Sequence, residues 1–124
     1  MVKLLASSSD DNTIRLWDVF NGHCLKIFKG HKNWIRSVAF SPNGKILASG
    51  SDDDTIKLWN IQDGRCIKTL LEHTNWVRSV IFSPDGKTLA SSGNDRTVKL
   101  WDVVDGICLL TLQKHTDWVR SVTF

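Results

Sequence analysis

Few features of this 124-residue sequence favour a membrane-spanning, secreted or disordered protein. No apolar run approaches the ~20 residues that a membrane-spanning helix needs. The opening Met1–Ala6 stretch is shorter than the ~7–15-residue apolar core of a signal peptide. The formal net charge of +3 is too small to indicate nucleic-acid binding by itself. With 41% hydrophobic and 23% charged residues, the composition is that of an ordinary globular protein.

A unit of 42 residues recurs almost three times along the chain. Segments 5–40, 47–82 and 89–124 align with 15 of 36 columns identical in all three copies. The repeated positions include Trp17, Trp59 and Trp101; Cys24, Cys66 and Cys108; His31, His73 and His115; Trp34, Trp76 and Trp118; and Arg36, Arg78 and Arg120. No linker or low-complexity tract interrupts this register, so the repeat governs the fold.

Each unit is predicted to contain four short strands. In the middle copy we expect them at Trp34–Phe40, Lys45–Ser49, Thr55–Trp59 and Arg65–Leu71, which are rich in β-branched, aromatic or alternating apolar residues. The sequence Ser-Pro-Asn-Gly at 41–44 separates the first two, because proline fixes φ and Asn-Gly accepts a positive φ. Helical periodicity is absent, so the fold class is all-β.

The repeated pattern resembles the WD40 repeat over essentially the whole chain. It runs from His31 through Trp34-Ile35-Arg36-Ser37-Val38-Ala39-Phe40-Ser41-Pro42-Asn43-Gly44 to Asp53 and Thr55-Ile56-Lys57-Leu58-Trp59. The resemblance implies a β-propeller, whose blades are four-stranded sheets around a central channel. The Gly-His pair is kept only at Gly30-His31, and the Trp-Asp pair becomes Trp59-Asn60 in the middle copy. Neither departure touches a core position.

The resemblance also sets the phase of the chain, with strands a to d counted outward from the channel. Residues 1–30 would supply strands b, c and d of a shared blade, residues 31–72 and 73–114 two complete blades, and residues 115–124 strand a. Three blades cannot close a ring, since propellers have ~4–8 blades or slightly more. We therefore expect closure by homo-oligomerisation, with strand Trp118–Phe124 of one chain beside Lys3–Ser7 of the next. A dimer gives six blades and a trimer nine; the alternative is an excised or designed segment of a longer array.

A polar set in each copy contains serine, histidine and aspartate, as in some hydrolases. The resemblance implies a buried structural hydrogen-bond network instead, and three equivalent copies favour architecture over catalysis. The three sets are His31, Ser49, Asp53 and Trp59; His73, Ser91, Asp95 and Trp101; and, divided between chains, His115, Ser7, Asp11 and Trp17. Ser51 is an alternative to Ser49. We expect no catalytic residue.

The three cysteines occupy one position in successive units. Such positions should lie well beyond the ~4.4–6.8 Å between Cα atoms that a disulfide needs. The odd count and the lack of paired spacing also argue against a disulfide framework and a zinc site. We expect reduced, partly buried thiols in a cytoplasmic protein, with no metal and no cofactor.

The repeated Trp-x-Arg pairs are the candidate partner-binding residues. Alternation along strand a places both side chains on one face, and the resemblance implies that this face surrounds the channel mouth, where such proteins commonly bind peptides. The set is Trp34, Arg36, Trp76, Arg78, Trp118 and Arg120, with Asp10, Asp52 and Asn94 on the turns beside it. Arginine binds carboxylate or phosphate in bidentate fashion, and tryptophan is a strong anchor. Alternatively, the arginines pair with the acidic turns and the tryptophans only cover the blade edge.

These features predict a non-catalytic scaffold that binds peptides or acidic protein segments, with no membrane partner. A self-assembling building block without a dedicated ligand is a serious alternative. Single-stranded nucleic-acid binding is a weaker one, because the acidic turns oppose it. An enzyme would need a cluster of His, Cys or acidic residues outside the repeat, and the sequence contains none.

Overall fold

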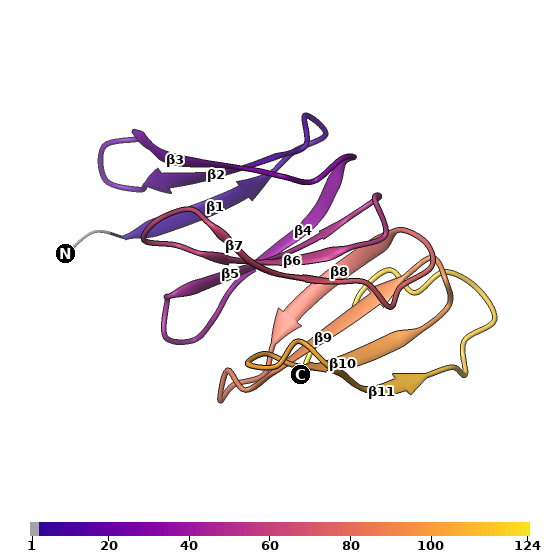
Figure 1. Ribbon diagram of the computed structural model, residues 1–124. Coiled ribbons are helices and arrows are strands. Elements are labelled where there is room, and N and C mark those ends of the chain that lie inside the picture. The colour runs from indigo at the N-terminus through magenta and orange to yellow at the C-terminus, as the bar shows by residue number, and fades with distance from the viewer. Residues whose placement is uncertain (1–2) are drawn as a thin grey trace.

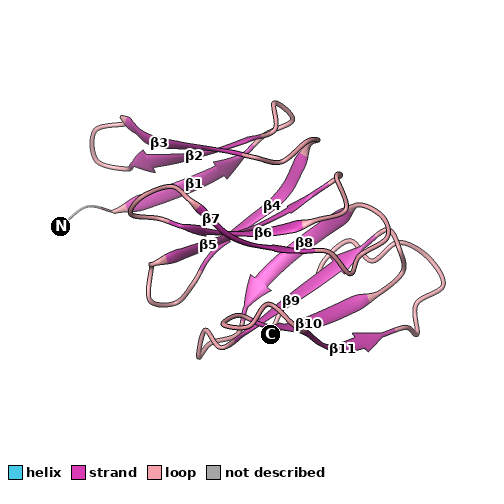
Figure 2. Cartoon of the chain, viewed as in Figure 1, coloured by secondary structure: helices cyan, strands magenta, loops and turns pink. Residues whose placement is uncertain are grey.

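The computed structural model describes residues 3–124, and this part of the chain forms strands and loops without a helix (Figure 2). Eleven strands make three antiparallel sheets that follow one another along the described chain (Figure 1). The all-β prediction is confirmed.

The first sheet contains β1 (Leu4–Ser8), β2 (Thr13–Asp18) and β3 (Cys24–Lys29), in that order. The second contains β4 (Ile35–Phe40), β5 (Ile46–Ser51), β6 (Ile56–Asn60) and β7 (Cys66–Leu70), also in sequence order. The third contains β8 (Val77–Phe82), β9 (Thr88–Gly93), β10 (Val98–Asp102) and β11 (Cys108–Leu112), with β8 at one edge and β11 at the other. The observed bounds in the first two sheets differ from the predicted ones by at most two residues.

Tight turns join neighbouring strands at equivalent places. After β4, the amide of Gly44 donates to the carbonyl oxygen of Ser41 at 2.9 Å, and Gly44 has φ 72°. Gly86 repeats this turn after β8, with the same φ of 72°. Glycine suits both places because a left-handed backbone strains residues that carry a Cβ.

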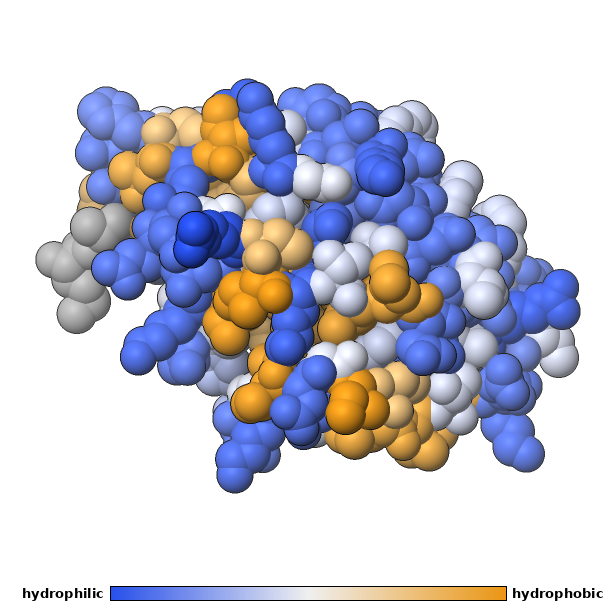
Figure 3. Space-filling view, viewed as in Figure 1, coloured by the Kyte–Doolittle hydropathy of each residue, from blue (hydrophilic) through white to orange (hydrophobic). Residues whose placement is uncertain are grey.

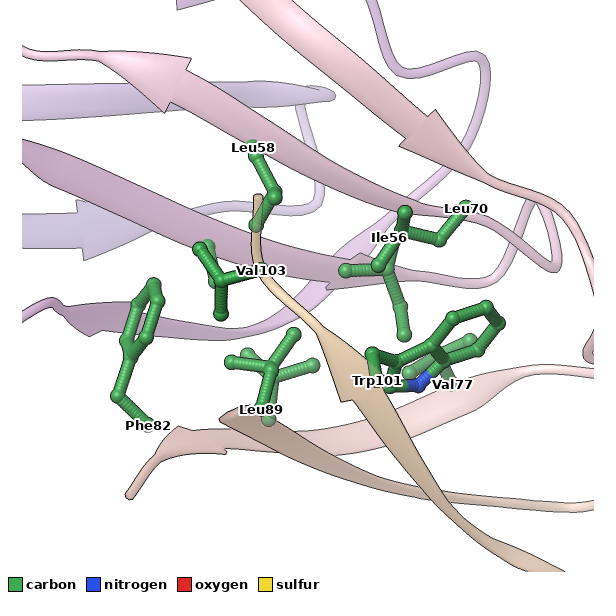
Figure 4. Close-up of a cluster of buried hydrophobic side chains, with 10 residues drawn as sticks. Ile56, Leu58, Leu70, Val77, Phe82, Leu89, Trp101 and Val103 are labelled. Carbon is green, nitrogen blue, oxygen red and sulfur yellow. The ribbon is translucent and has the colours of Figure 1, made fainter. Parts of the chain in front are cut away.

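Apolar side chains hold successive sheets together. Val77 of β8 and Trp101 of β10 pack against Ile56 and Leu70 of the second sheet, and all four are at most 3% exposed (Figure 4). Contact is closest at Gly50 on β5, where an added Cβ would lie 2.7 Å from Val77 Cγ1. A second cluster, which includes Ile14, Phe28, Ile35, Leu47 and Trp59, contains residues of both the first and second sheets.

The predicted strand at Trp118–Phe124 is not formed within the single chain, where residues 113–124 belong to no strand. The amide of Val119 donates to the carbonyl oxygen of Gly93 at 3.0 Å, just as the amide of Ile35 donates to that of Ser9. The segment therefore begins where an inner strand would begin. Because no described neighbour pairs with it as a strand, its strand state remains a prediction.

Candidate functional site

Each of the two four-stranded sheets has one complete His–Ser–Asp–Trp network of hydrogen bonds. In the second sheet, His31 lies 2.8 Å from Asp53 through Nδ1 and 2.6 Å from Ser49 Oγ through Nε2. Trp59 Nε1 donates to the same Ser49 oxygen at 2.8 Å. The network thus links the loop before β4 to strands β5 and β6 and to the turn between them.

The third sheet repeats this geometry closely. His73 lies 2.7 Å from Asp95 and 2.6 Å from Ser91 Oγ, and Trp101 Nε1 donates to Ser91 Oγ at 2.8 Å. Ser49 and Ser91 are both fully buried. Since each serine oxygen already accepts a tryptophan N–H in an interior position, neither is placed to attack a substrate from solvent.

Burial sets the protonation of this network. It lowers the pKa of His73, although Asp95 acts in the opposite direction. Burial alone would raise the pKa of Asp95, but hydrogen bonds from Thr97 and His73 outweigh it and lower that pKa. A neutral imidazole beside an ionised carboxylate fits one set of donors and acceptors along the network. Trp101 donates to Ser91, Ser91 to His73 Nε2, and His73 Nδ1 to Asp95.

The third set is incomplete in the single chain. Trp17 Nε1 donates to Ser7 Oγ at 2.9 Å, and Asp11 accepts a hydrogen bond from Thr13 at 2.6 Å. Asp11 has no histidine partner among the described residues, and His115 is exposed in the segment that follows β11 of the third sheet. The structure thus brings together Ser7 and Trp17 and separates both from His115.

Two details of these networks differ from the sequence analysis. Ser51, the alternative to Ser49, donates to the carbonyl oxygen of Trp34 at 2.8 Å rather than to the histidine. The networks also contain Thr55 and Thr97, which were not predicted to belong to them. Their hydroxyls donate to Asp53 and Asp95 at 2.6 and 2.7 Å. Identical threonines at this position in all three copies were the available signal.

The repeated Trp-x-Arg residues form one continuous stack, which we call the Trp–Arg ladder. Its members, in order, are Trp34, Arg36, Trp76, Arg78, Trp118 and Arg120. The Arg36 guanidinium carbon lies 5.1 and 4.9 Å from the ring centroids of Trp34 and Trp76. That of Arg78 lies 5.2 and 5.0 Å from those of Trp76 and Trp118. These distances suit cation–π contact, and the ladder crosses from one repeat to the next.

The two inner arginines have different partners on the neighbouring turns. Arg36 donates through Nε and Nη2 to the two oxygens of Asp52, at 2.9 and 3.0 Å. Arg78 donates through Nε to the amide oxygen of Asn94 at 2.7 Å. The alternative of pairing with acidic turns therefore holds for Arg36, whereas Arg78 meets a neutral group.

The pKa values of Arg36 and Arg78 shift in opposite directions. The hydrogen bond that Arg36 donates to Asp52 raises the pKa of Arg36, and the nearby charge of Asp10 also favours the protonated form. Burial lowers the pKa of Arg78, and repulsion from Arg36 and Arg120 adds to this effect. Asp52 and Asn94 are buried at the equivalent place in their turns, whereas Asp10 is exposed.

The outer end of the ladder borders an open hollow of about 400 Å³ lined by Asp117, Trp118 and Arg120. Trp34, at one end of the ladder, and Trp118, next to Arg120 at the other end, are 43% and 48% exposed. Over residues 3–124, no group of three histidine, cysteine or acidic side chains is arranged to hold a metal ion. No helix in that range is long and apolar enough to cross a membrane.

The cysteines lie on the outer strands and are free thiols. Cys108 is half-buried, as expected, but Cys24 and Cys66 are exposed. The expectation of partial burial was therefore wrong for these two, whereas Cys108 packs against the apolar cluster that contains Trp101.

Comparison with known families identifies the repeat. A family model described as "WD domain, G-beta repeat" matches residues 2–18, 22–60 and 64–102. The chain belongs to the WD40 family. Its three antiparallel sheets of three or four strands are consistent with WD40 blades.

Individual relatives match over about one WD40 repeat. Nuclear distribution protein PAC1 of Mycosarcoma maydis is 56% identical over 43 residues, which is 35% of this chain and 10% of that protein. PAC1 of Coccidioides posadasii is 55% identical over 42 residues, or 34% of this chain and 9% of the relative. A Lissencephaly-1 homolog of Heterostelium pallidum is 49% identical over 41 residues, or 33% and 10%. The chain thus spans only about a tenth of each relative's length, and these likenesses concern the repeat alone.

Proposed function

We propose that this WD40 chain is a non-catalytic interaction scaffold whose Trp–Arg ladder binds acidic segments of partner proteins. The observation that carries the proposal is the unbroken alternation of indole and guanidinium groups across three repeats. Arginine and tryptophan dominate the binding energy of many protein interfaces, and arginine binds carboxylates in bidentate fashion. The names of the PAC1 and Lissencephaly-1 relatives state no ligand or partner.

A labelled hexaglutamate peptide provides the direct test, with binding measured by fluorescence anisotropy. Replacing the three ladder arginines by alanine should abolish binding. The matched control replaces three exposed cations outside the ladder, Lys45, Arg65 and Lys87, and removes the same charge. Equal loss in both triple variants would show a general charge effect and contradict the proposal. So would unchanged binding in the ladder variant.

The two alternative functions give other outcomes in this assay. If the chain is a building block without a dedicated ligand, the intact protein does not bind the peptide. A single-strand binder prefers an oligothymidine to the peptide, with an affinity that falls steeply as salt rises. Either result would overturn the proposed peptide binding.

We further propose that several copies of the chain assemble into one propeller in the cytoplasm. Support comes from both flanks, where residues buried elsewhere are exposed. On the first sheet, Leu5 is 56% exposed, whereas its equivalent Leu47 is fully buried. On the third, Leu112 is 46% exposed, whereas its equivalent Leu70 is 3% exposed. Hydrophobic side chains gather over β3 and beside β11 in the space-filling view (Figure 3).

A second copy is the occupant that fits these flanks. Within the chain, one sheet-to-sheet interface already recurs at a spacing of 42 residues, so a neighbouring first sheet would continue it. Strand 118–124 of one copy would pair with β1 of the next, and His115 would reach Ser7 and Asp11 there. Two copies would give six blades and three would give nine.

Native mass spectrometry and light scattering test the assembly. A mass of two or three chains supports it. A monomer at micromolar concentration, with a sharp melting transition, would contradict it.

A further inference from the structure

The two inner arginines of the Trp–Arg ladder are chemically uneven, and Arg78 is the one without a carboxylate partner among the described residues. Both faces of its guanidinium lie against indole rings, and its Nε is engaged by Asn94. Across residues 3–124 no acceptor lies within hydrogen-bonding distance of either Nη atom, and no carboxylate forms an ion pair with this side chain. The remaining hydrogen-bonding directions therefore lie in the guanidinium plane, along its outer edge.

The equivalent position in the preceding blade is already neutralised. Arg36 uses its Nε and one Nη for the two oxygens of Asp52, whose side chain is 3% exposed. A ligand carboxylate at Arg36 would have to approach this fixed negative charge. The substitution of a neutral amide for the carboxylate at position 94 removes that repulsion next to Arg78.

We propose that Arg78 is the specific anchor of the ladder and that it grips a carboxylate or phosphate of an extended acidic peptide through its Nη edge. The inference rests on the proposed peptide-binding function and gives it a location, the inner arginine that lies over the rings of both Trp76 and Trp118. Trp76 and Trp118 restrict approach to the guanidinium plane, which favours two parallel hydrogen bonds to two ligand oxygens. Repulsion from Arg36 and Arg120 makes an anion at this point still more favourable.

The chain itself provides isosteric test variants, because position 52 holds aspartate where position 94 holds asparagine. Asn94→Asp should place a carboxylate against Arg78 and weaken binding of the hexaglutamate peptide about tenfold or more. Asp52→Asn should free Arg36, which shares the Trp76 ring with Arg78, and tighten binding of the same peptide. Each residue is already accommodated at the equivalent turn, and circular dichroism melting checks that both variants fold.

The double variant Asp52→Asn/Asn94→Asp keeps the net charge and exchanges the two environments. We expect it to bind the peptide, with Arg36→Ala now abolishing binding and Arg78→Ala having little effect. In the protein without these two changes, Arg78→Ala should abolish binding and Arg36→Ala should have little effect. A peptide of the same length with a single phosphoserine, compared with one carrying a single glutamate, identifies which oxyanion binds more tightly.

The outcomes separate this inference from the function on which it rests. If the intact protein binds the acidic peptide but Asn94→Asp binds equally well, the Arg78 site is wrong and the scaffold function stands. If Arg78→Ala still abolishes peptide binding in the double variant Asp52→Asn/Asn94→Asp, the Arg78 site is likewise wrong. If the intact protein binds neither peptide, both the function and the site are overturned.

Discussion

The first and second sheets carry the same repeated residues in different surroundings. Trp17 is half-buried and Ser7 exposed in the first sheet, whereas their equivalents Trp59 and Ser49 are 1% and 0% exposed in the second. The tryptophan–serine hydrogen bond is present in both, at 2.9 and 2.8 Å. Within a sheet, therefore, local sequence suffices to form this bond. The burial of the tryptophan and serine and their contact with the histidine depend instead on an inner strand, on the loop before it and on a neighbouring sheet.

The largest expected effect separates the two equivalent tryptophans. Trp59→Ala removes a side chain that belongs to the apolar cluster shared by the first two sheets, and should lower the free energy of unfolding by about 3–5 kcal/mol. Trp17→Ala should cost clearly less, because its ring is partly solvated in the single chain. Urea denaturation of dilute protein measures both. Equal costs would show that the first sheet is buried in solution.

The histidines extend the comparison to the loops. His73→Ala removes the hydrogen bonds of the buried imidazole with Ser91 and Asp95 and should cost about 1–3 kcal/mol. His115 is exposed, so His115→Ala should leave the unfolding of a dilute single chain unchanged. Sedimentation at rising concentration should instead show weaker association for this variant. If association is unaffected, the proposed contact of His115 with a neighbouring copy is wrong.

Acid should weaken the third sheet before the first one. The unfolded chain takes up a proton at a histidine with an ordinary pKa near 6.5, whereas the lowered pKa of folded His73 keeps its ring neutral. Stability is therefore full above that pH and falls as the pH drops below it. The lowered pKa of Asp95 adds a further loss at still lower pH.

Denaturation curves between pH 8 and pH 4 measure this dependence. His73→Gln should flatten the part of the profile near pH 6, whereas His115→Gln should leave it unchanged. An unaltered profile in His73→Gln would show that this histidine does not set the acid response.

The smallest expected effect concerns Ser92, whose buried hydroxyl has no hydrogen-bond partner among the described residues. Gly50 occupies the equivalent position in the second sheet. Ser92→Ala should raise the free energy of unfolding by about 1 kcal/mol, because it removes an unpaired polar group. Ser8→Ala, the equivalent change on the half-solvated first sheet, should have almost no effect. A loss of stability in Ser92→Ala would show that its hydroxyl has a partner in solution.

Strand positions were predictable because the repeat aligns three copies of each strand and marks the turns with Ser-Pro-Asn-Gly or Ser-Pro-Asp-Gly. The sequence also placed Trp34 and Arg36 on one face. It did not show that Arg36 lies between Trp34 and Trp76, because that contact depends on how close neighbouring sheets pack. The state of residues 118–124 was beyond reach for the same reason, since a strand needs a neighbour to pair with.

The sharing of each inner guanidinium between two indole rings has a consequence for how the repeats evolve. A change in one repeat alters the surroundings of an arginine that belongs to another, so no repeat can vary its outer chemistry alone. The order of the repeats along the polypeptide then carries information, because it decides which indole rings and which turn residue surround each arginine.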